Sequence, residues 1–165
     1  DASGRLTGLT LREAARGHRF WVLIASILVI ALAYGGAHIH MAQIVALHGF
    51  TPATAASVLG VVALGILAGR LIVGFLFDRF WAPGIAAPAM LLPAAACLLL
   101  MGTAPVLSQV MLGGFLLGFA AGAESDVIAF MAARYFGMVN YGRIYGMLYM
   151  PFGIASAISP IVYGR

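Results

Sequence analysis

Three charged side chains lie inside long apolar stretches of this sequence: Arg70, Glu124 and Asp126. At 1.5 Å per helical residue, each lies about 12 to 15 Å from the polar break that follows it, so all three share one depth. An arginine can hold a carboxylate with two hydrogen bonds without losing its charge, and a desolvated carboxylate can bind a proton near neutral pH. The pattern indicates proton-coupled anion binding by Arg70, with Glu124 or Asp126 carrying the proton. A structural ion pair is the alternative interpretation.

Other polar residues within the apolar stretches are weaker candidates. His38 could transfer protons because imidazole titrates near neutral pH, although an interfacial role is the alternative. His38 and His40 diverge on a helix, so we predict no shared metal ion. Tyr34, Tyr145 and Tyr149 could line a substrate cavity or belong to aromatic belts at the membrane surface. The sequence contains no nucleophile elbow, HExxH motif or P-loop, so we predict no enzymatic activity and no cofactor.

The composition places these residues in a membrane. Apolar residues make up 63% of the chain and charged residues 8%, whereas soluble domains carry roughly 25% charged residues. Apolar runs of about 20 residues alternate with short polar breaks, which is typical of bilayer-spanning helices. The net charge of +4 comes from arginines dispersed among those runs, so we expect a lipid bilayer and no nucleic acid as partner.

We predict an all-α membrane protein with five transmembrane helices, at about 20–42, 53–77, 84–103, 106–133 and 144–164. Residues 1–19 are expected to form a linker with a short basic helix that begins at the capping-box spacing of Thr10 and Glu13. The arginines beside the breaks all fall on one side of the membrane: Arg5, Arg12, Arg16, Arg19, Arg79, Arg134 and Arg143. The positive-inside rule predicts that this side, with the N-terminal segment, is cytoplasmic.

Small residues mark the expected contacts between the spans. Gly114, Gly118 and Gly122 precede Asp126 at intervals of four, so they form one stripe along the fourth span. Stripes of this kind allow membrane helices to approach closely. Gly65 and Gly69 form a similar patch just before Arg70, and we therefore expect close backbone packing beside the charged layer on both helices.

Several motifs carry a resemblance to a known family. The segment Gly69–Phe80, GRLIVGFLFDRF, resembles the glycine and Asp-Arg signature at the cytoplasmic end of the eighth helix in major facilitator superfamily transporters. LREA at 11–14 with RFW at 19–21, and RYFG at 134–137 with YGRIYG at 141–146, are similar to the branch of monocarboxylate transporters and oxalate/formate exchangers. The resemblance implies five helices, the seventh to the eleventh, of a major-facilitator-type six-helix bundle. The chain would then be a fragment whose N-terminal six-helix bundle and twelfth helix are missing.

The resemblance also implies roles for individual residues. Arg70 would bind the substrate carboxylate, while Asp78, Arg79 and Arg134 would contribute to a cytoplasmic gate. Similar oxalate exchangers carry a lysine early in the eleventh helix, and the corresponding stretch here has none, so we expect a monocarboxylate. The implied function is secondary active transport of small organic anions by alternating access, with protons as a candidate co-substrate.

A membrane-embedded sensor or assembly subunit with the same bundle and no transport is the alternative function. The richness in Gly, Ala and Arg without Lys favours a bacterial source. The predicted location is therefore the inner membrane of a bacterial cell.

Overall fold

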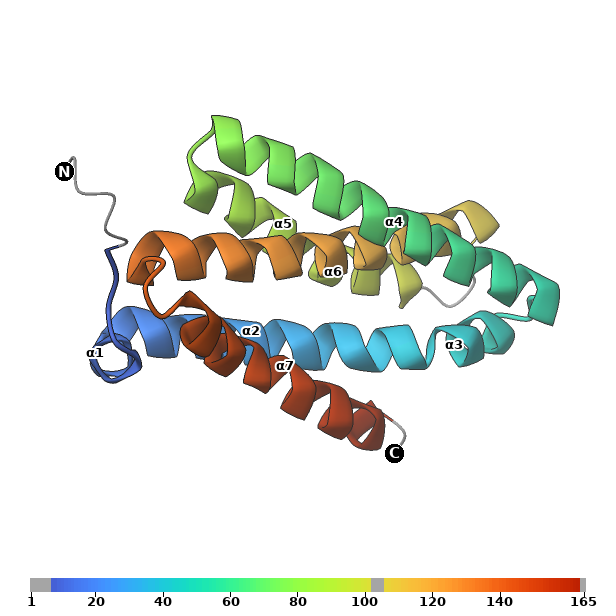
Figure 1. Cartoon of the computed structure of the whole chain (residues 1–165). Coiled ribbons are helices and arrows are strands. Elements are labelled where there is room, and N and C mark those ends of the chain that lie inside the picture. Colours follow the sequence, from blue (N-terminus) through green and yellow to red (C-terminus); the bar gives the residue numbers. More distant parts are fainter. Residues whose placement is uncertain (1–6, 102–105, 164–165) are drawn as a thin grey trace.

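The computed structural model describes residues 7–101 and 106–163, and these ranges are helical apart from short connections. Figure 1 shows the helices in chain order: α1 (Leu11–Arg16), α2 (His18–Ile39), α3 (Met41–Leu47), α4 (Pro52–Arg79), α5 (Ala82–Leu100), α6 (Leu107–Phe136) and α7 (Tyr141–Tyr163). The predictions for residues 1–6 including Arg5, for the end of the span 84–103 and for residue 164 lie outside the described residues.

Local chemistry fixes where several helices begin. At the start of α1, the backbone amide and hydroxyl of Thr10 donate to the Glu13 carboxylate at 2.7 and 2.8 Å, which confirms the predicted capping box. These hydrogen bonds lower the pKa of Glu13 because they stabilise its charged form. At the start of α4, the Thr51 hydroxyl accepts from the Thr54 amide at 3.3 Å, and Pro52 occupies the first turn, where a missing N–H costs nothing.

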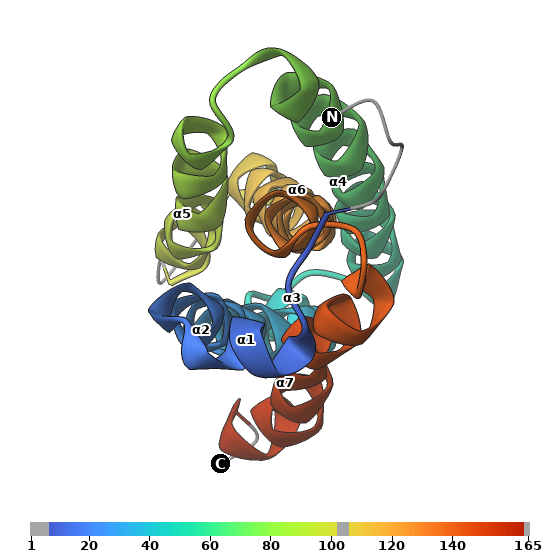
Figure 2. The same cartoon turned by 60° about the vertical axis from the view of Figure 1, so that its left-hand side comes forward.

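Helix α6 is the centre of the bundle. It packs against α4, α5 and α7, and α2 packs against α7. Figure 2 views the bundle nearly end-on and shows α6 between the α4–α5 pair on one side and α1, α2 and α7 on the other. This position explains why α6 contributes more buried residues than any other described helix, among them Leu117, Ala120 and Ile128.

The contact between α4 and α6 depends on glycine. A Cβ atom at Gly118 would overlap the Val62 carbonyl oxygen, and one at Gly122 would overlap the carbonyl oxygen of Ile66. Seen from α4, a Cβ atom at Gly65 or Gly69 would overlap the backbone of α6 in the same way. The predicted glycine stripe is therefore a packing face on both helices, as expected for closely approaching membrane helices.

The N-terminal segment is attached to the α6–α7 turn. The Leu9 amide donates to the Phe136 carbonyl at 2.8 Å, and the Asn140 side chain donates to the Leu9 carbonyl at 3.1 Å. Gly137 between these contacts has a φ of 76°, and a Cβ atom there would overlap the Thr7 carbonyl oxygen. The turn therefore requires glycine both for its conformation and for the close approach of the N-terminal segment.

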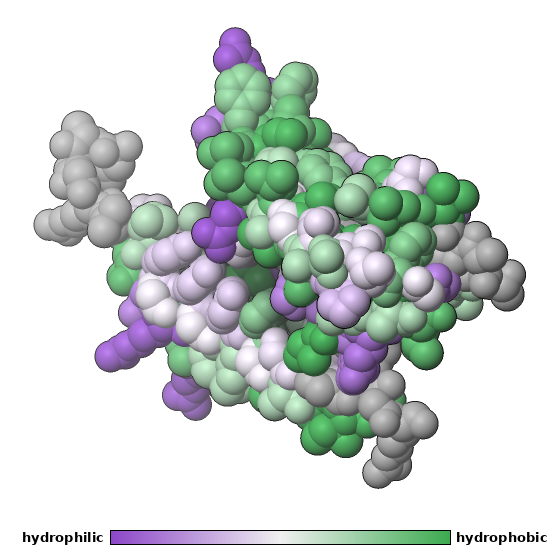
Figure 3. All heavy atoms as spheres, turned by 90° about the vertical axis from the view of Figure 1, so that its right-hand side faces the viewer, coloured by the Kyte–Doolittle hydropathy of each residue, from purple (hydrophilic) through white to green (hydrophobic). Residues whose placement is uncertain are grey.

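Four of the described helices are long and apolar enough to cross a membrane: α2, α4, α5 and α6. Large apolar side chains on α4 are exposed, among them Leu64, Leu67 and Leu71, as expected for a surface covered by lipid or by other helices. Apolar residues also make up much of the face in Figure 3, with hydrophilic residues in scattered patches. The chain is thus an all-α protein with the properties of an integral membrane protein. The fifth predicted span forms α7, which is not among those four, and its crossing stays a prediction.

The helix boundaries differ from the predicted spans mainly at the first one. That span was expected at about 20–42, but α2 ends at Ile39 and a short helix, α3, begins at Met41. His40 between them has φ −88° and ψ 6°, which interrupts the helical hydrogen bonding. Helix α5 continues through Pro88 and Pro93, as membrane helices tolerate.

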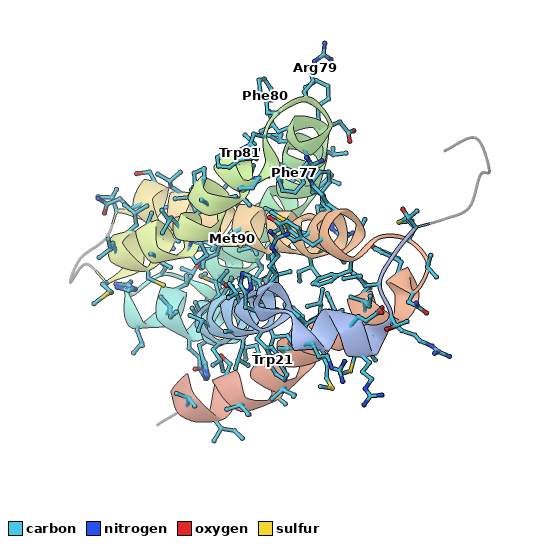
Figure 4. All side chains as sticks on the ribbon, turned by 90° about the vertical axis from the view of Figure 1, so that its left-hand side faces the viewer. Trp21, Phe77, Arg79, Phe80, Trp81 and Met90 are labelled. Carbon is cyan, nitrogen blue, oxygen red and sulfur yellow. The ribbon has the colours of Figure 1, made fainter. Side chains whose placement is uncertain are left out.

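The arginine-rich breaks lie together at one end of the bundle. The α4–α5 turn, the α6–α7 turn and α1 share the left-hand end in Figure 1. Figure 4 faces this end and shows Arg79 and Phe80 projecting beyond the ribbons, with Trp81 beside them and Trp21 on α2. Trp21 is 58% exposed and Trp81 74%, which suits aromatic anchors at a membrane surface. The clustering agrees with the positive-inside argument, although the orientation itself stays a prediction.

We predict that replacing Gly118 by alanine disrupts the bundle, because the new methyl group must overlap the Val62 carbonyl oxygen. Overpacking of this kind costs about 1 to 3 kcal/mol or more. Thermal unfolding in detergent measures the effect as a lower Tm. Gly60→Ala on α4, the helix that Gly118 contacts, is the matched control, since nothing lies within 4 Å of its Cβ position. Equal Tm values for the Gly118→Ala and Gly60→Ala variants would show that the contact is not tight.

Candidate functional site

A cavity of about 180 Å³ lies between four helices and is lined by Arg70 and Glu124, two of the three charged residues predicted from the sequence, but not by Asp126. Helix α4 contributes Arg70 to its lining and α6 contributes Glu124, while Tyr34 comes from α2 and Tyr149 from α7. The predicted charged layer is therefore a shared site between helices far apart in the sequence. The two charged side chains can meet there because the glycine contact brings α4 and α6 together.

Glu124 is the most unusual residue of the site. It is 3% exposed, and neither carboxylate oxygen has a hydrogen-bond partner among the described residues. A carboxylate ion buried in this way costs several kcal/mol, and a bound proton or a nearby cation removes that cost. Of the two acidic residues, Glu124 turns towards the inter-helix cavity while Asp126 is the more exposed.

Arg70 is exposed in this bundle, although its neighbours on α4 are apolar. Its charge acts on Asp126, whose carboxylate oxygen lies 3.6 Å from the Cβ position of Gly74, one turn further along α4. No salt bridge joins Arg70 to Glu124 or Asp126 in the described part of the chain, so the structural ion pair considered as the alternative interpretation is not formed there. The N–H donors of the Arg70 guanidinium are therefore available to a bound anion.

The predicted tyrosines divide into two groups. Tyr34 and Tyr149 line the cavity, whereas Tyr145 does not. Instead, Tyr145 stacks between Tyr141 and Tyr149, with ring centroids 5.6 and 5.7 Å apart. These residues are spaced by four on α7, so they follow one face of the helix. Tyr145 supports the Tyr149 ring from the side nearer the α6–α7 turn.

The histidines lie beside the cavity and beyond it. His38 is half-buried and its ring stacks on Tyr34 with centroids 5.1 Å apart, one turn further along α2. His38 is thus adjacent to a cavity residue but does not line the cavity itself. The His40 ring shares a hydrogen bond of 2.6 Å with Gln43 at the α2–α3 break.

The three residues assigned to a cytoplasmic gate lie at the arginine-rich end but do not contact one another. Arg79 lies over the Phe75 ring at 5.7 Å, and Arg134 over the Phe130 ring at 6.0 Å. Both contacts are one turn apart on a single helix, so they tether each arginine to its own helix. Asp78 is exposed in the last turn of α4. A gate between these residues stays a prediction.

Sequence reasoning missed part of the cavity wall, namely Ile66, Ala121, Ser125, Ile128 and Phe152. Ile66 is one turn from Arg70 and Ser125 adjoins Glu124, so helical spacing from the charged residues could have indicated them. Nothing in the sequence marked Phe152, because its position depends on how α7 crosses the bundle.

Other features of the described residues suit ligand binding less well. A larger cavity of about 380 Å³ lies between α3 and α5. Its lining is apolar apart from the His48 imidazole and the Cys97 thiol. Such a wall offers nothing to orient a charged ligand. Within the described ranges, no three His, Cys, Asp or Glu side chains come together as metal ligands.

Comparison with known proteins does not extend these assignments, because no protein-family model and no curated protein matches the chain.

We predict that a lipid-soluble carbodiimide modifies Glu124 in preference to Asp126. The reagent reacts irreversibly with the protonated fraction of a carboxyl group in apolar surroundings, so it traps even a small fraction, and Glu124 is buried without a partner. Peptide mass spectrometry locates the adduct, and labelling should decrease as the pH rises and the carboxyl group loses its proton. Glu124→Gln is the control that removes the target. Labelling of Asp126 with none on Glu124 would contradict the assignment.

Proposed function

We propose that this chain is most of the C-terminal half of a major-facilitator-type secondary transporter that moves small monocarboxylates together with protons. The observation that carries the proposal is Glu124, which is buried without a partner and shares one cavity with the Arg70 guanidinium. A charge at this depth is costly, and ionisable residues inside membrane helices usually serve transport or proton transfer.

Charge balance in the cavity supplies the coupling. When the cavity is empty, an ionised Glu124 offsets the positive charge of Arg70. When a carboxylate binds Arg70 with two hydrogen bonds, Glu124 must take up a proton to keep the cavity neutral. If the carboxylate binds without the proton, or the proton without the carboxylate, the cavity keeps a net charge. Such a charge costs at least about 2.5 to 3.5 kcal/mol in the membrane interior. The anion and the proton therefore bind and leave together, one of each.

Four helices meet at the cavity, so movement of the bundle exposes it to each side of the membrane in turn. Family resemblance implies a second six-helix bundle against the exposed face that carries Arg70, as in alternating-access transporters. Asp78, Arg79 and Arg134 at the arginine-rich end are the candidates for contacts that form when this end closes. The arginine-rich end, with the N-terminal segment, faces the cytoplasm in this proposal, and the membrane is the inner membrane of a bacterial cell.

The experiment that tests the proposal is uptake of labelled lactate, pyruvate, formate, oxalate and benzoate by the full-length protein in proteoliposomes. An inward proton gradient should stimulate uptake of monocarboxylates but not of oxalate. Specific binding without any flux would support a membrane sensor instead and contradict the proposal.

We predict that variants at Arg70 and Glu124 change anion uptake in different ways. Arg70→Gln should abolish saturable uptake, because no cation remains to bind the carboxylate, and Arg70→Lys should restore it only in part because lysine lacks the guanidinium fork. Glu124→Gln mimics the protonated state, so it should retain anion exchange while losing stimulation by a proton gradient. Immunoblotting of the membrane fraction controls for expression. Gradient-driven uptake in the Glu124→Gln variant would exclude Glu124 as proton carrier.

A further inference from the structure

We propose that the ligand of the cavity between Arg70 and Glu124 is a small carboxylate with a flat aromatic body, such as benzoate, whose ring is recognised by Phe152 and Tyr149. This inference rests on the proposed function and adds to it the chemical class of the substrate.

The charged groups of the cavity suit one carboxylate, and the other polar side chains of its wall are Tyr34, Tyr149 and Ser125. Arg70 binds the anionic end, and Glu124 holds the accompanying proton. The hydroxyl of Ser125 donates to the Gly122 carbonyl at 2.9 Å, so its proton is already engaged within α6. The volume of about 180 Å³ is below the roughly 300 to 1,000 Å³ of sites for drug-sized ligands, which limits the ligand to a small molecule.

The rest of the wall is apolar and largely aromatic. Ile66, Ala121 and Ile128 face the body of the ligand, together with the rings of Tyr34, Tyr149 and Phe152. A polar body would lose its hydration against Ile66, Ala121, Ile128 and Phe152, with only the Tyr34 and Tyr149 hydroxyls among these side chains as partners, at a cost in free energy. A ligand whose body is apolar pays no such cost, so the wall favours it.

The arrangement of the rings favours a flat body in particular. The Tyr149 and Phe152 rings lie with centroids 5.1 Å apart at an angle of 32°, and Tyr34 approaches from the other helix, α2. Aromatic rings attract one another in offset or edge-on arrangements at centroid distances of about 4.5 to 7 Å. A single planar ring can make such contacts with both α7 rings, whereas a saturated ring of the same size cannot.

The same aromatic face continues from the cavity to the end of the bundle. Tyr149 is 36% exposed and stacks on Tyr145, which stacks on Tyr141 at an angle of 18° beside the α6–α7 turn. These rings are only partly covered by the other described helices. A flat apolar ligand that approaches along α7 meets the edges of these stacked rings before it reaches the cavity. The face thus provides a path that suits the same chemistry as the site.

The test compares three labelled carboxylates with the full-length protein in proteoliposomes: benzoate, cyclohexanecarboxylate and lactate. Benzoate should have the highest kcat/KM, about 2- to 12-fold above cyclohexanecarboxylate, which is similar in size but neither planar nor aromatic. Uptake of lactate or cyclohexanecarboxylate equal to or above that of benzoate would overturn the inference and leave the proposed function intact. No proton-stimulated uptake of any of the three would overturn both.

Variants on α7 and α6 test the ring contacts through the ratio of benzoate to cyclohexanecarboxylate uptake, which is independent of the amount of folded protein. Phe152→Leu keeps an apolar side chain but removes the ring, so the ratio should fall towards one. Tyr149→Phe keeps the ring and should preserve the ratio. Phe115→Leu is the matched control, because Phe115 stacks on Phe119 on α6 and does not line the cavity. An unchanged ratio in Phe152→Leu would show that this ring does not recognise the substrate.

Discussion

The close backbone contact between α4 and α6 is the constraint on which the rest of the structure depends. Helices can approach this closely only where glycine replaces larger residues, and Gly118 and Gly122 provide such positions against the carbonyl groups of Val62 and Ile66. The contact places α6 at the centre of the bundle and sets the depth of Arg70 relative to Glu124. Packing and function are therefore coupled, because the residues that hold the helices together also position the charges.

The positions of Arg70 and Glu124 indicate a function because a lipid bilayer, unlike water, cannot compensate their charges. In a soluble protein, an exposed arginine near a buried glutamate would indicate little about function, because water compensates either charge. In a bundle with four helices long and apolar enough to cross a membrane, an unpartnered carboxyl group must exchange a proton or find a cation. The cavity offers Arg70 as that cation. In the proposed function a bound anion competes for it, so proton binding by Glu124 and anion binding by Arg70 are two parts of one charge balance.

Much of this arrangement could be predicted from the sequence, because hydropathy, glycine spacing and the depth of the charged residues all follow from positions along single helices. The approximate boundaries of α4 and α6, the glycine contact and the placement of Arg70 and Glu124 at one depth were indicated in this way. What could not be predicted depends on the relative rotation and crossing of helices. That rotation buries Glu124 rather than Asp126, brings Phe152 into the cavity wall and leaves Tyr145 outside it.

The central claim is that Glu124 and a bound carboxylate share one charge balance, and infrared difference spectroscopy of the full-length protein tests it most directly. The account predicts that adding benzoate at neutral pH produces the carbonyl band of a newly protonated carboxyl group, and that this band is absent in the Glu124→Gln variant. Saturation with ligand while the Glu124 carboxyl group keeps its original protonation state would contradict the account, because anion binding would then be independent of the proton.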